Sequence, residues 1–294
     1  MQNKNVIITG GSGFIGSHLA EALANKGYIV TIFDVSEPHF TPQIPFIKGS
    51  ITDRVAVNKA LKGMDVVFHL AGMLGTHETV ETAHQTAEIN ILGMLNVLDA
   101  AREHGVAVLD VTKPNYWRNT YTITKVAAEE FSFMYRDEFD MNVKAVRWFN
   151  VYGPRQRTED QGYQKAVPTF IMRALKGEPF TIYGDGTQGT DHIYVSDAVD
   201  ATIAVFESPH IPQEAVEIGS GEEITVNEIA DIILRLTKSP SKRQEVSMRR
   251  GETEHTRIKA DISVLKNKIG FTPKIGFGDG ILKTIEYYRL SLKL

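Results

Sequence analysis

The sequence contains no cysteine among its 294 residues. This absence excludes disulfide bonds, thiolate nucleophiles and cysteine-ligated metal sites. The sequence also lacks an apolar run of the roughly 20 residues that a membrane-spanning helix needs. Residues 1–10 lead directly into a strand pattern without a hydrophobic signal segment, so we expect a cytoplasmic protein rather than a secreted one.

An excess of basic residues is also missing. Lysine and arginine number 32 and aspartate and glutamate 36, which gives a net charge of −4. Without a basic block, neither nucleic acid nor an anionic membrane surface is expected as the main partner. Hydrophobic residues make up 42% of the sequence, which favours a folded protein with a large core, in one large domain or two interlocked ones.

Short apolar stretches alternate with amphipathic stretches through the first half of the sequence. Helices are predicted at residues 14–26, 54–62, 80–104 and 119–139, and Asp53 is the expected N-cap of the second. Strands are predicted at residues 6–9, 28–33, 44–47, 66–70, 106–111 and 143–147. Because βαβ crossovers are right-handed, this alternation predicts a parallel sheet covered by helices on both faces.

The pattern changes after about residue 150. Residues 151–163 are typical of a long functional loop, and residues 237–250 of a solvated linker. Shorter elements are predicted at residues 167–176, 180–183, 195–207, 215–218, 226–236 and 278–290. We therefore expect a cofactor-binding domain formed by residues 1–166 and 190–209, and a smaller substrate-binding lobe formed by residues 167–189 and 210–294.

A glycine-rich motif, Thr9-Gly10-Gly11-Ser12-Gly13-Phe14-Ile15-Gly16, follows the first predicted strand and opens the first predicted helix. In that context glycines allow a tight turn and a close approach of the backbone to a pyrophosphate at the helix N-terminus. Asp34 ends the second strand, where a carboxylate binds an adenosine ribose and repels a 2′-phosphate. The two features predict NAD as the cofactor rather than NADP.

Tyr121 and Lys125 are four residues apart on a predicted helix, so both side chains lie on one face. A nearby ammonium lowers the pKa of a phenol, whose ordinary value of about 10 is too high for a base at neutral pH. The pair is a candidate general acid and base for a sugar hydroxyl or carbonyl. Such a pair is common by chance, and it gains meaning here from the glycine motif and Asp34.

With these residues the sequence resembles the extended short-chain dehydrogenases/reductases, and among them the NAD-dependent epimerase/dehydratase family that acts on nucleotide sugars. The resemblance covers nearly the whole chain. Further motifs that carry it are His69-Leu70-Ala71-Gly72, Asn90-Ile91-Leu92-Gly93, Arg147 to Gln156, Ile182 to Gln188, Tyr194-Val195-Ser196-Asp197, Ile218-Gly219-Ser220-Gly221 and Arg249-Arg250-Gly251-Glu252. It implies an α/β fold, with a Rossmann-type doubly wound parallel sheet and a smaller C-terminal α/β substrate lobe.

The resemblance also implies roles for individual residues. Tyr121 is the acid/base, and Lys125 binds the nicotinamide ribose and tunes Tyr121. Ser50 stands where the family has an aspartate, so one adenine contact is weakened, and Asn90 supports the helix that carries the active site. The implied NAD-binding residues are Gly10, Gly13, Phe14, Ile15, Gly16, Asp34, Ser50, Ile51, Leu70, Ala71, Gly72, Asn90, Tyr121, Lys125, Phe149 and Val151.

For the substrate, the resemblance implies Asn150, Val167, Tyr183 and Arg249, with Arg249 on the diphosphate. Relatives have an arginine where this chain has Thr190, so one diphosphate contact is missing. Four residues are candidates to replace it: Lys165, Arg155, Arg157 and Arg250.

The segment before Tyr121 departs from the family. A catalytic hydroxyl is expected after the fifth strand, and Thr112, with Asp110 on the same face, is the candidate for it although Tyr121 follows only nine positions later. The competing interpretation is that Thr112 merely ends a strand. Glu129 and Glu130 are expected to be surface charges. His77 and His84 are too isolated to predict a metal site.

The favoured function is an NAD-dependent nucleotide-sugar 4-epimerase that acts on a UDP-hexose or UDP-hexuronate through a 4-keto intermediate. The alternatives are a 4,6-dehydratase or a decarboxylase of the same family, and a non-catalytic dinucleotide-sensing protein. Residues 113–120 contain no acidic side chain, which argues against the dehydratase and the decarboxylase. Arg118 lies in the same segment, so a sugar substrate with a carboxylate is still compatible with the sequence. By analogy with the family, we expect a homodimer through helices 80–104 and 119–139.

Overall fold

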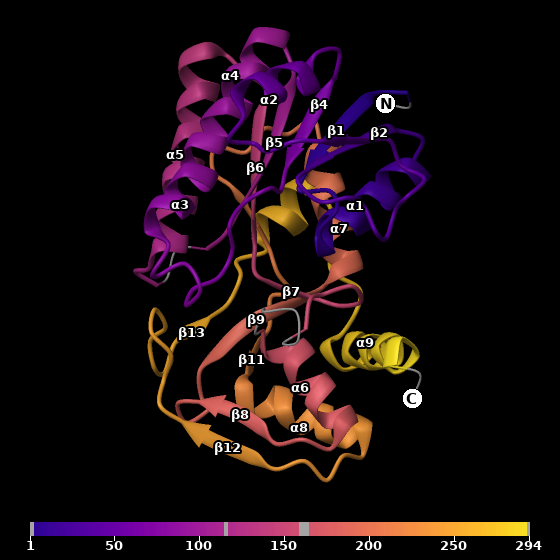
Figure 1. The fold of residues 1–294 in the computed structure, drawn as a ribbon, viewed down its shortest axis with the longest axis vertical. Helices are drawn as coiled ribbons and strands as arrows, with labels where there is room; N and C mark the ends of the chain where they lie inside the picture. The colour runs from indigo at the N-terminus through magenta and orange to yellow at the C-terminus, as the bar shows by residue number, and fades with distance from the viewer. Residues whose placement is uncertain (1–2, 115–116, 159–164, 293–294) are drawn as a thin grey trace.

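Seven parallel strands form the larger sheet, in the order β10-β6-β5-β4-β1-β2-β3 (Figure 1). The computed structural model describes residues 3–114, 117–158 and 165–292. The strands are β1 (Asn5–Thr9), β2 (Ile29–Asp34), β3 (Phe46–Lys48), β4 (Val66–His69), β5 (Ala107–Thr112), β6 (Val143–Trp148) and β10 (Val216–Ile218). β1 pairs with both β2 and β4, so the strand order reverses on either side of β1. The doubly wound fold predicted from the sequence is confirmed.

Helices cover both faces of this sheet. A cluster of buried residues joins one face to α2 (Arg54–Leu61), α4 (Gly93–His104) and α5 (Thr120–Phe139). The other face packs against α1 (Phe14–Asn25) and α7 (Val195–Glu207). The predicted N-cap is confirmed, because the carboxylate of Asp53 accepts hydrogen bonds from the backbone N–H groups of Val55 and Ala56, both at 3.0 Å.

The prediction of one continuous helix at residues 80–104 is wrong about where the helix starts and about its continuity. It begins at α3 (Ala83–Ala87), passes through the π-helical segment η1 (Glu88–Leu92) and ends as α4. The wider π turn contains the buried Asn90, whose amide bonds to a neighbouring loop. A π-helical turn is a frequent feature of functional sites and leaves the hydrophobic periodicity almost unchanged, so the sequence pattern does not reveal it.

A smaller lobe lies below the large sheet in Figure 1. Its four-stranded sheet consists of β7 (Asn150–Tyr152), β9 (Gly189–Tyr194), β11 (Glu223–Thr225) and β13 (Arg257–Ile258). A separate pair joins β8 (Phe180–Tyr183) to β12 (Arg243–Val246). The helices of this lobe are α6 (Ala166–Lys176), α8 (Val226–Thr237) and α9 (Phe277–Leu292), whereas the π-helical segment η3 (Leu265–Ile269) packs against α7 and β10 of the large sheet.

β9 was not predicted because a carboxylate occupies one of its interior positions. Asp191 is fully buried and accepts hydrogen bonds from the backbone N–H groups of Ser220 and Gly221, at 2.7 and 2.8 Å. Its burial depends on these partners from a distant loop, since a buried carboxylate needs hydrogen bonds. Because a polar residue occupies an interior position, the pattern of hydrophobic alternation does not predict a strand there.

Two predicted loops contain strands. Within residues 237–250, β12 pairs with β8, so the expectation of an unstructured linker is wrong there, although all four side chains of β12 are exposed. Residues 151 and 152 belong to β7, which pairs with β9. The remainder of the loop predicted at 151–163 extends into residues that lie outside the described part of the chain.

The strand pairing adds detail to the predicted division into a cofactor domain and a substrate lobe. β10 lies within residues 210–294, yet it is hydrogen-bonded to β6 in the large sheet. β9 lies mostly within residues 190–209, yet it is central to the smaller sheet. Of the helices in the described residues, none is both long and apolar enough to cross a membrane.

Candidate functional site

The glycine motif lies at the carboxyl end of β1, where the strand order of the large sheet reverses. Gly10 has a φ of +72°, and a Cβ at this position would lie 2.8 Å from the backbone nitrogen of Ala71. A Cβ at Gly16 would clash with the carbonyl oxygen of Gly10. These glycines are therefore required by close backbone packing. Ligands of open α/β sheets bind in the crevice at such a reversal point.

Helix α1 starts at this loop without a side-chain cap. Gly13 is its N-cap residue, so Phe14, Ile15 and Gly16 form the first helical turn. The unpaired N–H groups and the dipole of a helix N-terminus bind phosphate groups. The loop therefore has the geometry and the charge preference that a dinucleotide pyrophosphate requires.

Asp34 ends β2 beside this loop. Its two carboxylate oxygens accept hydrogen bonds from the backbone N–H groups of Ser12, at 3.1 Å, and Ser36, at 3.0 Å. Both bonds fix the carboxylate next to the glycine motif, and its remaining lone pairs can accept hydrogen bonds from a ribose diol. This arrangement fits the NAD-binding position that the sequence predicted.

The segment after β4 forms the opposite side of the reversal point. The backbone N–H of Ala71 donates to the hydroxyl of Thr9 at 3.2 Å, and Leu70 and Gly72 flank it. The buried Asn90 accepts from Met73 N at 2.7 Å and donates to its carbonyl at 3.0 Å. Its amide also donates to the hydroxyl of Thr124 on α5, at 3.0 Å. Asn90 therefore joins this loop to the helix that carries Tyr121, as expected for a supporting residue.

Ser50 and Ile51 follow β3 and differ in their surroundings. The Ser50 hydroxyl lies 2.8 Å from that of Thr52. Ile51 is buried, and its side chain packs against Gly93 at the start of α4, where a Cβ would lie 2.6 Å from Cδ1 of Ile51. Ile51 therefore helps to hold α4 in place, in addition to its predicted position near adenine.

Tyr121 and Lys125 lie on the first two turns of α5. The side chain of Asn119 caps this helix by accepting a hydrogen bond from the backbone N–H of Thr122 at 2.9 Å. Lys125 is buried, and its Nζ donates to the carbonyl oxygen of Val111 at 2.6 Å. Tyr121 is half-buried. The start of α5 is therefore fixed against the carboxyl end of β5, next to the crevice.

The environment of Thr112 was not foreseen. Its hydroxyl donates to the carboxylate of Glu129, and the same carboxylate accepts bonds from Nε of Arg147 at 3.1 and 3.0 Å. The expectation that Glu129 is a surface charge is wrong, because it is 4% exposed, whereas Glu130 is exposed. The reason is β6, which places Arg147 beside Thr112 in the strand register. Along α5, Glu129 is ~12 Å from Tyr121, at 1.5 Å per residue.

Lys113 is a site residue that the sequence reasoning missed. It follows β5 directly, is buried, and donates from Nζ to the hydroxyl of Thr122 at 2.6 Å. The same Nζ lies 5.3 Å from the centroid of the Tyr121 ring. Burial, with a smaller contribution from the charge of Lys165, lowers the pKa of Lys113 to about 7. Its position at the carboxyl end of a central strand was a signal that could have identified it.

The predicted substrate residues are spread over the lower lobe. The amide of Asn150 donates to the hydroxyl of Thr190 at 2.8 Å, so these two residues form one polar unit on β7 and β9. Val167 is buried in α6. Phe149 and Val151, on either side of Asn150, are buried in the core that both lobes share.

Arg249 lies over the ring of Tyr183, with 4.7 Å between its guanidinium carbon and the ring centroid. Its Nη2 donates to Oε1 of Glu252 at 2.5 Å, and the hydroxyl of Thr76 donates to the same oxygen at 3.0 Å. Asn119, the cap of α5, donates to the carbonyl of Gly251 at 3.0 Å. The segment that carries Arg249 is thus attached to the loop after β4 and to the start of α5.

The structure narrows the candidates for the cation that would replace the family arginine at Thr190. Arg155 forms an ion pair with Glu21 on α1 at 2.8 Å. Arg250 is exposed and pairs with Glu81 at 2.7 Å. Arg157 is exposed. Lys165, at the N-cap of α6, is the candidate that is electrostatically coupled to Lys113 and so to the surroundings of Tyr121.

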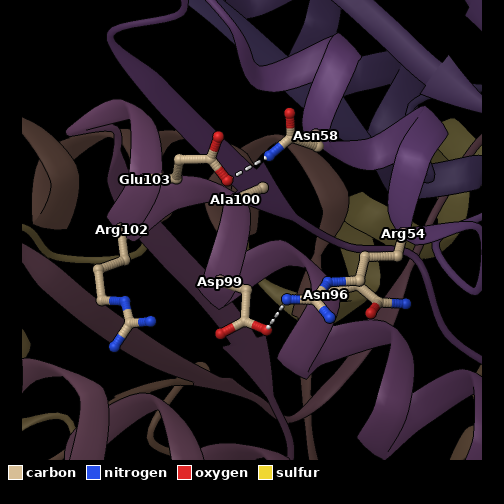
Figure 2. A pocket seen from close by; sticks show the side chains of 7 residues that line it. All are labelled: Arg54, Asn58, Asn96, Asp99, Ala100, Arg102 and Glu103. Atoms are coloured by element: carbon tan, nitrogen blue, oxygen red, sulfur yellow. Dashed lines mark hydrogen bonds and ion pairs between the residues drawn. The ribbon is translucent and has the colours of Figure 1, made fainter.

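Two other features lie apart from this site. Within the described ranges there is no group of three histidine, aspartate or glutamate side chains placed to hold a metal. A cavity of about 260 Å³ lies between α2 and α4. Figure 2 shows the side chains that line it, with Asn58 bonded to Glu103 and Arg54 to Asp99. No predicted site residue contributes to the lining of this cavity.

Comparison with known proteins agrees with this geometry. A sequence model of the NAD dependent epimerase/dehydratase family matches residues 6–111 and 109–219. The chain is 36% identical to a UDP-N-acetyl-alpha-D-glucosaminuronate decarboxylase of Bacillus cytotoxicus, over 97% of this chain and 98% of that protein.

Solved structures resemble the whole chain. The UDP-glucose 4-epimerase of Thermotoga maritima, with UDP-glucose, superposes with a TM-score of 0.90 at 28% identity, over 98% of this chain and 99% of that one. The UDP-glucuronic acid 4-epimerase of Bacillus cereus, with UDP-glucuronic acid and NAD, gives 0.88 at 25% identity and the same coverage. The protein therefore belongs to the NAD-dependent epimerase/dehydratase family.

Proposed function

We propose that the protein is an NAD-dependent nucleotide-sugar 4-epimerase that acts through a transient 4-keto intermediate. One observation supports this proposal: the glycine motif after β1 and the start of α5, which carries Tyr121 and Lys125, lie at the same carboxyl edge of the parallel sheet. Asn90 links the loop after β4 to α5 through Met73 and Thr124. A dinucleotide and a proton-transfer group are thereby brought to the same place.

The chain's residues fit NAD. The uncapped first turn of α1 and the close-packed glycines suit the pyrophosphate, and the Asp34 carboxylate suits the adenosine ribose. Ala71 follows β4 on the other side of the reversal point, and we assign Lys125, held at the carboxyl end of β5, to the nicotinamide ribose. When bound, NAD supplies a hydride acceptor and donor for C4 of the sugar.

The protein residues supply proton transfer and binding. Tyr121 removes the proton from O4 of the sugar and later returns it to the same oxygen. The ammonium of Lys125 stabilises the phenolate form of Tyr121. Asn150 and Arg249 hold the sugar nucleotide, and Arg249 suits the diphosphate because its planar guanidinium donates two parallel bonds. We assign Thr112 no role at O4, because its buried hydroxyl donates to Glu129, which is ~12 Å from Tyr121 along α5.

The substrate class follows from the relatives. UDP-glucose and UDP-glucuronic acid are present in similar structures, and we infer a UDP-hexose or UDP-hexuronate for this chain. We also propose a homodimer through the faces of α4 and α5, and a cytoplasmic location.

A second candidate is decarboxylation of a UDP-linked hexuronate. The 36% identity to a decarboxylase over nearly the whole chain favours it. The first half-reaction is common to both candidates, because oxidation at C4 converts a hexuronate into a β-keto acid, which loses CO₂ readily. The absence of an acidic residue at positions 113–120 argues for epimerisation, since the family resemblance implies that decarboxylases use a glutamate together with an arginine for the substrate carboxylate.

A substrate panel tests the proposal. The protein is incubated with NAD and with UDP-glucose, UDP-galactose, UDP-glucuronate or UDP-galacturonate, and the products are followed by NMR and mass spectrometry. The expected product is the C4 epimer with unchanged mass. Loss of CO₂ would establish the decarboxylase, and loss of water the dehydratase. NAD binding without turnover of any sugar would favour the dinucleotide-sensing protein.

A further inference from the structure

We propose that Lys113 forms a subsite for the carboxylate of an acidic sugar, so that the substrate class is a nucleotide-linked hexuronate rather than a neutral hexose. This inference rests on the proposed function, because it takes Tyr121 as the group that acts at O4. The inference chooses between a UDP-hexose and a UDP-hexuronate, which are both compatible with the sequence and with the relatives.

The position of Lys113 is the first argument. It lies directly after β5, at the carboxyl edge of the sheet where ligands of this fold bind. Its Nζ lies beside two successive residues of α5, 2.6 Å from the Thr122 hydroxyl and 5.3 Å from the Tyr121 ring centroid. The cation is therefore held at the face of the residue that would remove the proton from O4.

Sugar chemistry supplies the second argument. In a hexuronate the carboxylate is attached to C5, the ring carbon next to C4. Substituents on adjacent ring carbons lie side by side, so a cation beside Tyr121 also lies beside the carboxylate when O4 reaches Tyr121. In a neutral hexose the same place is taken by a CH₂OH group, which offers no charge to a lysine.

The third argument is electrostatic. Lys113 is buried and electrostatically coupled to Lys165, the N-cap residue of α6, and both effects lower its pKa to about 7. A carboxylate beside Lys113 would compensate its charge and stabilise its protonated form. Tyr121 and Lys125 are the other titratable groups that α5 brings to this side. The carboxylate of Glu129 is bonded to Arg147 and Thr112, away from Lys113.

Other cations are less suited to this role. Arg118, which kept an acidic sugar possible in the sequence, is exposed. Arg249 lies over Tyr183 and pairs with Glu252. Its place in the lower lobe suits the diphosphate. Lys125 is also buried next to Tyr121, but it is assigned to the nicotinamide ribose, which leaves Lys113 for the sugar carboxylate.

Isothermal titration calorimetry of the NAD-loaded protein tests the subsite. UDP-glucuronate and UDP-glucose are titrated at pH 8 in two buffers with different ionisation enthalpies. The natural protein should bind UDP-glucuronate with uptake of a proton, because Lys113 is mostly neutral at pH 8 and becomes charged beside the carboxylate. UDP-glucose should bind without that uptake.

Three variants make the assignment specific. Lys113→Met should weaken UDP-glucuronate about 10- to 100-fold, the range for a hydrogen bond between charged groups, and leave UDP-glucose nearly unchanged. Lys113→Arg should keep the preference for the acid but abolish the proton uptake, since arginine stays charged. Lys144→Met removes another buried lysine, whose Nζ donates to the carbonyls of Val205 and Phe206, and should change neither quantity.

Equal losses for both sugars in Lys113→Met, or an unchanged preference for the acid, would overturn the subsite. Proton uptake that persists in Lys113→Arg would overturn it too, and this result is independent of whether the methionine variant folds. Neither outcome touches the proposed function, which fails in the product assay if no sugar nucleotide is converted or if the product has lost CO₂ or water.

Discussion

Arg147 on β6 donates from Nε to both carboxylate oxygens of Glu129 on α5, at 3.1 and 3.0 Å. The same carboxylate accepts a hydrogen bond from the hydroxyl of Thr112 on β5. This contact attaches the helix that carries Tyr121 and Lys125 to two neighbouring strands of the sheet. Helix α5 is thus positioned by an ion pair as well as by apolar packing.

Replacing Glu129 with alanine should lower the free energy of unfolding by about 3–5 kcal/mol, because the largely buried Arg147 would lose its partner. The double variant Glu129→Leu with Arg147→Met should recover much of that loss, since it removes both charges. Urea denaturation measures both effects. Glu130→Gln, on the exposed side of α5, is the control and should change the value by less than about 0.5 kcal/mol. Equal stability of Glu129→Ala and the natural protein would contradict the role given to the pair.

Tyr121→Phe should reduce turnover at least about a hundredfold, because the group that exchanges a proton with O4 is lost. Binding of NAD should persist, since the glycine motif and Asp34 are untouched. Product formation by NMR and NAD content by mass spectrometry measure the two effects. Tyr135 lies on the same helix as Tyr121, and its hydroxyl donates to Asp99 on α4 at 2.7 Å; Tyr135→Phe removes this hydroxyl and should leave turnover intact. An active Tyr121→Phe protein would refute the assignment.

The natural protein should bind NAD more tightly than NADP by about tenfold or more, because the Asp34 carboxylate repels a 2′-phosphate. Asp34→Asn keeps an acceptor for the backbone N–H of Ser12 but removes the charge, so the discrimination should fall while the loop persists. Dissociation constants from fluorescence titration measure the ratio. Tighter binding of NADP by the natural protein would show that the prediction is wrong.

Protonation of His69 should contribute to unfolding in acid. Burial lowers the pKa of His69 from its usual 6.5 to about 3, with a smaller contribution from the charge of Lys125. Between pH 6.5 and about 3, the unfolded chain therefore binds a proton at His69 that the folded protein does not bind. Its contribution to stability is present above pH 6.5 and is lost progressively as the pH falls towards 3.

The variant His69→Asn isolates this effect, because it can retain a partner for the Thr9 hydroxyl, which lies 2.8 Å from Nδ1. Its free energy of unfolding should depend less steeply on pH between 6 and 4 than that of the natural protein. Thermal or urea denaturation across this range measures the slopes. Parallel curves for the two proteins would mean that His69 does not titrate on unfolding.

Features that depend on neighbours along the chain could be predicted from the sequence. The glycine motif between β1 and α1, the N-cap Asp53 and the spacing of Tyr121 and Lys125 all fall in this class. Each depends on backbone geometry over a few residues, and glycine, aspartate and the helical repeat carry that information directly.

Features that depend on partners distant in sequence could not be predicted. The sequence indicated a surface charge at Glu129, but in the fold β6 places Arg147 beside it. Asp191 interrupts the hydrophobic pattern of β9, and its burial depends on hydrogen bonds from Ser220 and Gly221. In both cases a carboxylate is stable inside the protein because remote donors bond to it, and no local pattern of residues announces such donors.

The sequence by itself determined the doubly wound sheet, the dinucleotide crevice and the Tyr121–Lys125 pair, because periodicity and glycine placement act locally. Only the tertiary structure decided which charges face the crevice. The fold turns the Thr112 hydroxyl towards Glu129 and brings the Lys113 side chain beside the Tyr121 ring. It also brings Lys113 under the influence of the charge of Lys165, because parallel strands and a separate helix place distant parts of the sequence together.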